Sequence, residues 1–211
     1  MISPLLNIAA ALSGAQAPAA EDALIGQLRY YGSCIVTVYP TRAILLLNTE
    51  RGTKLERTRL RRFVKSARRG GFCWPTHQTP RLTATLIRGA LAEALYLRIP
   101  RSVTAPMLKA AAAPAEIRTA NDIHEFARCV VSMNVPGVDT LLRTRAVTGY
   151  SPLGEFSRCG PDWQRMWTPV SIRAALAEEI YARASAWRRA TAAGNLKENP
   201  QLVRPGIEEG I

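Results

Sequence analysis

Residues 34–48, Cys34-Ile-Val-Thr-Val-Tyr-Pro-Thr-Arg-Ala-Ile-Leu-Leu-Leu-Asn48, carry the clearest β-strand signal in the chain. Two runs of β-branched and other apolar residues, 34–39 and 43–48, flank Pro40-Thr41-Arg42, a pattern typical of two strands joined by a turn. Because both runs are almost entirely apolar, we expect a hairpin that is buried against helices. The expected fold class is therefore α+β, predominantly α-helical, with a compact helical body and one short buried β-hairpin over about residues 34–48.

The rest of the chain shows helical periodicity, with Ser, Thr, Pro and Gly at the boundaries of the periodic segments. Thr-Pro pairs at 79–80 and 168–169 are typical helix starts. No internal repeat is apparent. We expect one globular domain over 1–195, with a subdivision near 70–80 that would separate 1–70 from 80–195, and a flexible tail over 196–211. The expected helices cover residues 4–13, 19–31, 80–97, 104–113, 122–135, 138–147 and 169–194.

A strongly basic run follows the predicted hairpin directly. Residues 51–69 hold nine basic side chains and one acid, a net +8 out of +12 for the whole chain. Thr53 and Glu56 have the spacing of a capping box, in which a hydroxyl and a carboxylate satisfy backbone donors of the first helical turn. Gly70 and Gly71 provide a stop signal. The run therefore predicts a capped helix over about 54–69.

On a helical wheel this predicted helix is amphipathic. Leu60, Phe63 and Val64 form a narrow apolar stripe that can dock on the protein body, and a basic arc spans about 140° beside it. The arc predicts a phosphate-binding surface, because several cations on one face release counterions together when a polyanion binds. The predicted nucleic-acid-binding residues are Lys54, Arg57, Arg61, Arg62, Lys65, Arg68 and Arg69.

The expected function is a non-enzymatic nucleic-acid-binding regulator or accessory factor, with DNA or RNA as its partner. Two alternatives stay open: an interaction subunit that docks on an acidic protein, and a metal-dependent nucleic-acid-processing enzyme. A plain solvated surface is the simplest reading of a charge run. We assign no catalytic residue and expect no cofactor, because no nucleotide-binding or catalytic motif stands out.

Cysteines and histidines offer one composite metal pattern. Cys73 and His77 are spaced C-x3-H, and His124 and Cys129 are spaced H-x4-C, so these four side chains could hold zinc if their segments met. Neither pair has the spacing of a common zinc finger, so we expect no metal and interpret the four cysteines as buried free thiols. In a secreted chain they would instead form two disulfides with three alternative connectivities.

No apolar stretch approaches the roughly 20 residues that a transmembrane helix needs. Residues 4–12 are mildly apolar and precede Ala15-Gln16-Ala17, which resembles a signal-peptide cleavage site. No basic residue precedes this stretch, so an ordinary helix is preferred over a signal peptide at 1–17. We therefore expect a cytoplasmic protein.

Overall fold

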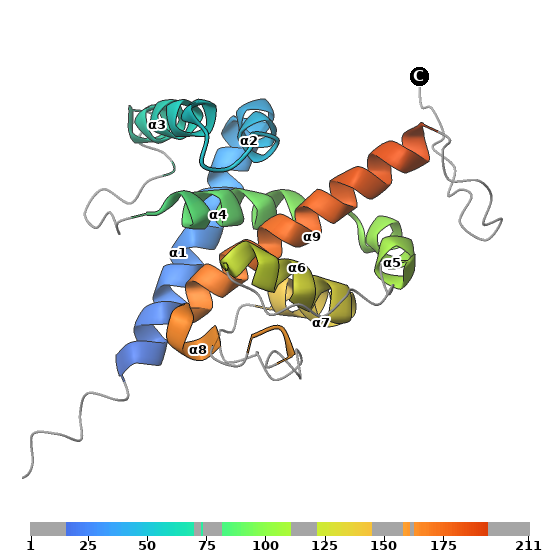
Figure 1. Cartoon of the computed structure of the whole chain (residues 1–211). Coiled ribbons are helices and arrows are strands. Elements are labelled where there is room, and N and C mark those ends of the chain that lie inside the picture. The colour runs from blue at the N-terminus through green and yellow to red at the C-terminus, as the bar shows by residue number, and fades with distance from the viewer. Residues whose placement is uncertain are drawn as a thin grey trace, which may run out of the picture.

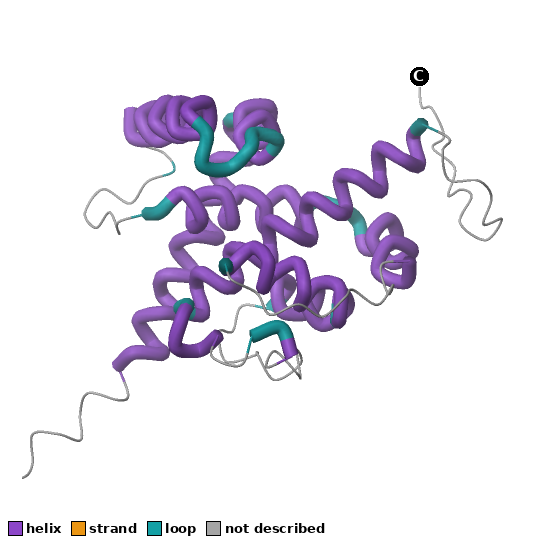
Figure 2. Tube along the Cα trace, viewed as in Figure 1, coloured by secondary structure: helices purple, strands orange, loops and turns teal. Residues whose placement is uncertain are grey.

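The computed structural model describes residues 16–69, 73, 82–110, 122–144, 158–160 and 163–193, which form helices joined by short loops (Figures 1 and 2). The predicted elements over 1–15, most of 70–80 and the tail over 196–211 lie outside the described residues. The helices are α1 (Gln16–Val38), α2 (Pro40–Leu47), α3 (Lys54–Arg69), α4 (Ala84–Leu97), α5 (Arg101–Ala110), α6 (Ile123–Met133), α7 (Val135–Arg143), α8 (Trp163–Met166) and α9 (Pro169–Ala192).

The predicted β-hairpin is wrong, because residues 34–48 form the end of α1 and the whole of α2. Pro40 occupies the first turn of α2, where a missing N–H costs nothing, and so it starts a helix and does not shape a hairpin turn. Ala43 and Leu46 of α2 are buried, whereas Ile44 and Leu45 are exposed. A continuous apolar run does not distinguish a buried strand from a helix. The described residues contain no strand, so this part of the chain is all-α.

Helices α4 and α9 pack against each other at the centre of the molecule, and α1 and α6 pack on them (Figure 1). The two central helices touch at Gly89 and Ala174: a Cβ atom on Gly89 would lie only 2.3 Å from the Cβ of Ala174. One apolar cluster joins α1, α2, α3 and α4, and a second joins α6, α7 and α9 to part of α4. The core is therefore built around a close helix–helix crossing that a small residue allows.

The two central helices also share a sequence. Residues 87–98 read IRGALAEALYLR and residues 172–183 read IRAALAEEIYAR, with eight of twelve positions identical. Each helix begins after a threonine cap, Thr83 or Thr168, whose side chain accepts a hydrogen bond from the backbone of Leu86 or Ser171. The expectation of no internal repeat is therefore wrong, because the repeat lies 85 positions away and is interrupted by segments of unequal length.

The repeat extends to the helices that precede the central pair. Residues 34–49 (CIVTVYPTRAILLLNT) align without a gap to 129–144 (CVVSMNVPGVDTLLRT). In both segments a cysteine lies near the end of a helix, and a second helix with proline in its first turn follows. The chain thus contains two copies of one unit, in which α1, α2 and α4 correspond to α6, α7 and α9. Both disulfides also correspond, because Cys34 of α1 bonds Cys73 and Cys129 of α6 bonds Cys159.

Candidate functional site

Helix α3 begins with the predicted capping residues in a modified arrangement. The backbone N–H of Glu56 donates to Thr53 Oγ1 at 3.1 Å, as in a capping box. The Glu56 carboxylate accepts at 2.6 Å from the backbone of Gly52, one residue before the cap. Gly52 has a positive φ of 75°, a conformation that glycine adopts without steric cost. The start of α3 is therefore set by local sequence signals.

The second oxygen of Glu56 ties α3 to the centre of the molecule. Glu56 is buried, and its Oε1 lies 3.1 Å from Nη1 of Arg88, a buried arginine of α4. The guanidinium of Arg88 also pairs with buried Glu178 of α9 and donates to three backbone oxygens at the end of α2. These three acceptors are the carbonyl groups of Leu46, Leu47 and Thr49. One side chain thus joins α2, α3 and α9 to α4.

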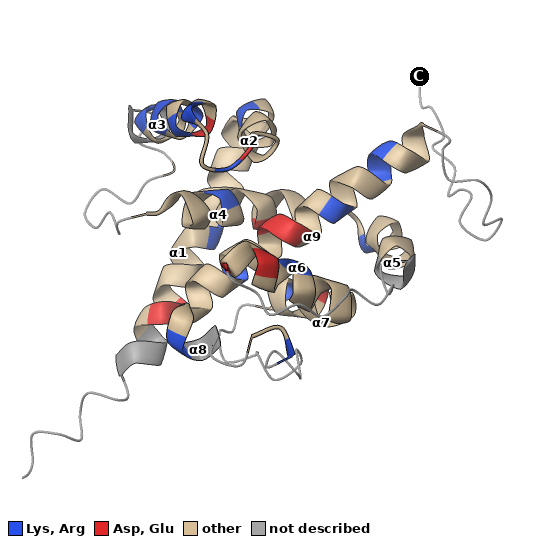
Figure 3. Ribbon diagram, in the orientation of Figure 1, with Lys and Arg blue, Asp and Glu red and all other residues tan. Residues whose placement is uncertain are grey.

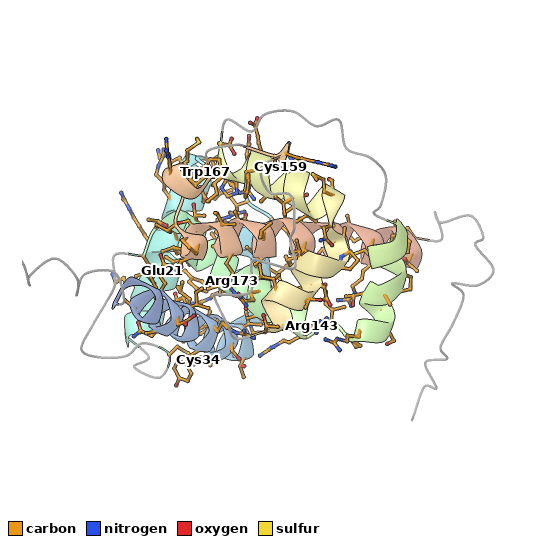
Figure 4. All side chains as sticks on the ribbon, turned by 90° about the horizontal axis from the view of Figure 1, so that it is seen from below. Glu21, Cys34, Arg143, Cys159, Trp167 and Arg173 are labelled. Atoms are coloured by element: carbon orange, nitrogen blue, oxygen red, sulfur yellow. A yellow bond between two sulfur atoms is a disulfide. The ribbon has the colours of Figure 1, made fainter. Side chains whose placement is uncertain are left out.

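The second copy of the repeat contains the matching cluster. Arg173 of α9, the counterpart of Arg88, makes two hydrogen bonds to Glu93 of α4, at 3.1 and 2.8 Å. It also donates to the carbonyl groups of Leu141, Leu142 and Thr144, the positions that correspond to Leu46, Leu47 and Thr49. Each arginine pairs with the glutamate of the opposite copy, so the two units are held together by reciprocal buried ion pairs. Figure 4 shows Arg173 between Cys34 and Cys159, which lie on opposite sides of the molecule.

Sequence reasoning missed both clusters. The signal that could have identified them is the repeated Ile-Arg-x-Ala-Leu-Ala-Glu pattern, because an arginine and a glutamate inside an apolar helical stretch need buried partners. Glu179, which is next to Glu178 in the chain, forms an ordinary ion pair with Arg183 within α9.

The basic arc of α3 is oriented as predicted where the structure describes it. Phe63 is buried, and Leu60 and Val64 pack against the apolar cluster of the first copy. Arg59 turns back toward α2, where its Nη1 donates to the backbone oxygen of Leu45 at 2.6 Å. Five predicted binding residues of α3 are exposed: Lys54, Arg57, Arg61, Arg62 and Lys65. Figure 3 shows the basic positions of α3 in blue. Arg68 and Arg69 belong to the helix, but their side chains lie outside the described part.

The positive charges of this basic face are largely not neutralised by neighbouring carboxylates. Nη1 of Arg57 donates to the backbone oxygen of Gly52 at 2.8 Å, which leaves its charge unneutralised. Among the described acidic residues, none forms an ion pair with Lys54, Arg61, Arg62 or Lys65. Unpaired like charges on one face repel each other, so the face is suited to bind a polyanion.

The composite zinc pattern is not a metal site. Cys73 and Cys129 are each bonded to another cysteine, so neither sulfur is available as the thiolate that zinc requires. His77 lies outside the described residues, and within the described segments no group of three or more His, Cys, Asp and Glu residues is placed to hold a metal ion. The prediction of four free thiols is also wrong. Chain spacing offered no signal for the pairing, because each bridge spans 30 or more residues.

His124 of α6 borders the polar cluster around Glu178. It is half-buried, and its Nδ1 atom has no hydrogen-bond partner among the described residues. Burial lowers the pKa of His124, and the positive charge of Arg51 lowers it further, while the Glu178 carboxylate opposes both effects. The corresponding residue of the first copy is Arg29, which pairs with Glu93 at 3.3 Å. A titratable side chain thus occupies one of two equivalent positions.

We expect the stability of the protein to fall as the pH falls below about 6.5, the ordinary pKa of histidine, and His124→Gln to reduce this loss. With its pKa lowered in the folded state, His124 is neutral there and takes up a proton more readily in the unfolded chain. The stability that neutral His124 contributes is therefore fully present above its pKa in the unfolded chain. This stability is lost as the pH falls toward its pKa in the folded protein. Urea unfolding between about pH 7.5 and pH 5 measures the difference. Equal pH profiles for both proteins would contradict this role.

Comparisons place the chain in no group: no family model, curated protein or solved structure matches it. None of the helices in the described segments is long and apolar enough to cross a membrane.

Proposed function

We propose that this protein is a disulfide-stabilised binding protein that uses the exposed cations of α3 to bind an acidic protein partner. The observation that carries the proposal is the set of five exposed basic side chains on α3, none of which has a carboxylate partner among the described residues. The helix that presents them is held at its start by the Glu56–Arg88 ion pair and packed through Phe63. Binding to a preorganised surface loses less conformational entropy than binding to a loose tail.

The two disulfides favour a protein partner over nucleic acid. Structural disulfides persist in oxidising compartments and are rare in the reducing cytosol and nucleus, where nucleic acids are concentrated. This weighs against the expected cytoplasmic location, and an oxidising compartment is part of the proposal. An acidic surface of another protein is one polyanion that such a compartment offers.

Nucleic acid is the second candidate partner. It is favoured by the ratio of arginine to lysine on α3, because guanidinium groups make forked contacts with phosphate oxygens. In that case α3 would contact the phosphate backbone, and binding would fall steeply with salt. A nucleic-acid-processing enzyme would need catalytic residues, and none is assigned.

The test compares the affinities of polyglutamate, single-stranded DNA and duplex DNA, measured by fluorescence anisotropy over a series of salt concentrations. We expect polyglutamate to bind at low salt. The double variant Arg61→Ala/Lys65→Ala should weaken this binding by up to about 30-fold, since each of the two exposed ion pairs contributes up to about 1 kcal/mol. Arg101→Ala, which removes an exposed arginine of α5, is the matched control and should leave affinity unchanged.

Each alternative result has a clear meaning. Tight binding of either DNA with weak binding of polyglutamate would select the second candidate. An equal loss per removed charge in the Arg101→Ala control would show that net charge alone governs binding and that α3 has no special role. Absence of binding by all three probes at low salt would contradict both candidates.

A further inference from the structure

We infer that the partner surface extends from α3 onto the exposed apolar side chains of α2, so that the partner is an acidic protein segment that also carries apolar side chains. This inference rests on the proposed function and specifies the chemistry of its partner. It comes from comparing the two copies of the repeat, because each copy shows which residues the shared fold requires.

The buried positions of α2 are the same kind of residue in both copies. Ala43 and Leu46 of α2 are buried, and so are their counterparts in α7, Val138 and Leu141. The exposed positions differ. Ile44 and Leu45 are 39% and 47% exposed. In their places the second copy has Asp139, which is buried and accepts a hydrogen bond from the hydroxyl of Tyr96, and Thr140, which is exposed. The fold of the unit therefore does not need large apolar side chains at these positions.

The same copy also carries the basic helix. Between Thr49 and Cys73 the first copy has 23 residues (50–72), whereas between Thr144 and Cys159 the second has 14 (145–158). The longer segment contains nine basic residues and the shorter one two. The two features that the fold does not demand, the exposed apolar pair on α2 and the basic segment, thus occur together in one copy.

These two features adjoin in space. Arg59 of α3 donates to the backbone oxygen of Leu45 and to Thr49 Oγ1, which brings α3 against α2. Leu55 lies one helical turn before Arg59 on the same face of α3, and it is 53% exposed. Figures 1 and 3 show the basic α3 beside the largely uncharged α2 at one end of the molecule. The result is an exposed apolar strip bordered by cations, the arrangement of a protein interface with an apolar centre and a charged rim.

Charge selects the occupant of this surface. A second copy of the chain would bring one basic face against another, with a formal charge of +12 on each molecule. A nucleic-acid phosphate backbone would gain little from contact with exposed leucine and isoleucine, because its contacts are polar and ionic. An acidic segment with interspersed apolar side chains complements both parts of the surface.

The experiment uses two probes, polyglutamate and a random copolymer of glutamate and tyrosine, with the full chain in its oxidised form. The variant Ile44→Asn/Leu45→Thr copies the polarity of the second copy without changing the charge. We expect the wild type to bind the copolymer about ten-fold more tightly than polyglutamate, and the variant to lose this preference, because burial of aliphatic side chains supplies it. Val103→Thr, at an exposed apolar position of α5, is the control that should keep the preference.

Unchanged affinity of the variant for polyglutamate shows that α2 and α3 remain folded, and it separates the apolar contribution from the ionic one. If the variant keeps the copolymer preference, or the wild type binds both probes equally, the inference is overturned while the proposed function stands. If neither probe binds at low salt, the inference and the proposed function both fail.

Discussion

Arg88→Met is expected to destabilise the protein by about 3–5 kcal/mol, the usual cost of removing one partner from a buried ion pair. Arg88 is 3% exposed, and its guanidinium contacts the carboxylates of Glu56 and Glu178. Methionine fills a similar volume but donates no hydrogen bond. Two buried carboxylates and three backbone carbonyl groups at the end of α2 would then lose their shared donor.

Urea unfolding followed by circular dichroism measures this loss. Arg88→Lys should recover little of it, because a lysine ammonium cannot reproduce the planar fork that reaches several acceptors at once. Arg101→Met removes an exposed arginine and should change the free energy of unfolding by less than about 0.5 kcal/mol. If Arg88→Met unfolded at the same urea concentration as the Arg101 variant, the cluster around Arg88 would have no role in stability.

Gly89→Ala is expected to cost about 1–3 kcal/mol, although alanine favours helix formation by about 1 kcal/mol over glycine. A Cβ atom at this position would lie 2.4 Å from the Cα of Ala174, so the backbones of α4 and α9 would have to separate. Gly26→Ala is the matched control, since a Cβ at Gly26 of α1 meets nothing within 4 Å. That substitution should stabilise the protein by about 0.4–1 kcal/mol.

The repeat provides a sharper test of the same contact. Gly89 and Ala174 occupy equivalent positions of the two copies and touch each other where α4 crosses α9. The exchange Gly89→Ala/Ala174→Gly removes the Cβ of residue 174 but leaves its Cα and carbonyl oxygen, which a Cβ at position 89 would meet at 2.4 and 2.6 Å. It should therefore recover only part of the stability that Gly89→Ala loses. Thermal unfolding of the single and double variants measures the recovery. A double variant no more stable than Gly89→Ala would show that the Cβ of Ala174 contributes nothing to the cost of the Gly89→Ala substitution.

Much of the local structure was predictable. The basic helix was expected over 54–69 and is observed as Lys54–Arg69, and the helix expected from 169 is observed as Pro169–Ala192. These predictions succeeded because capping groups act on backbone atoms only two or three residues away, as Thr53 and Thr168 do. The exposed basic arc followed from helical periodicity alone, so most of the candidate binding face could be named from residue spacing.

The hairpin prediction failed for a different physical reason. The apolar run over 34–48 is compatible with a strand or with helices buried on one side, and its neighbours in space select between them. Tyr31 and Ile35 pack with Leu91 of α4 in one apolar cluster, and these contacts require α1 to continue as a helix through Val38. Local residue preferences therefore favoured a strand that long-range packing overruled.

Helix boundaries, caps and the basic face of α3 are thus encoded in residues that are neighbours along the chain, and spacing reveals them. The disulfide partners, the reciprocal pairs Arg88–Glu178 and Arg173–Glu93, and the contact of Gly89 with Ala174 join residues between 30 and 90 positions apart. Such contacts depend on how α4 and α9 cross. A charged side chain or a sulfur atom finds its partner only when folding brings the two within bonding distance. The repeated sequence indicates that the chain contains two related units. Which residues of the two units contact each other is decided only by the tertiary structure.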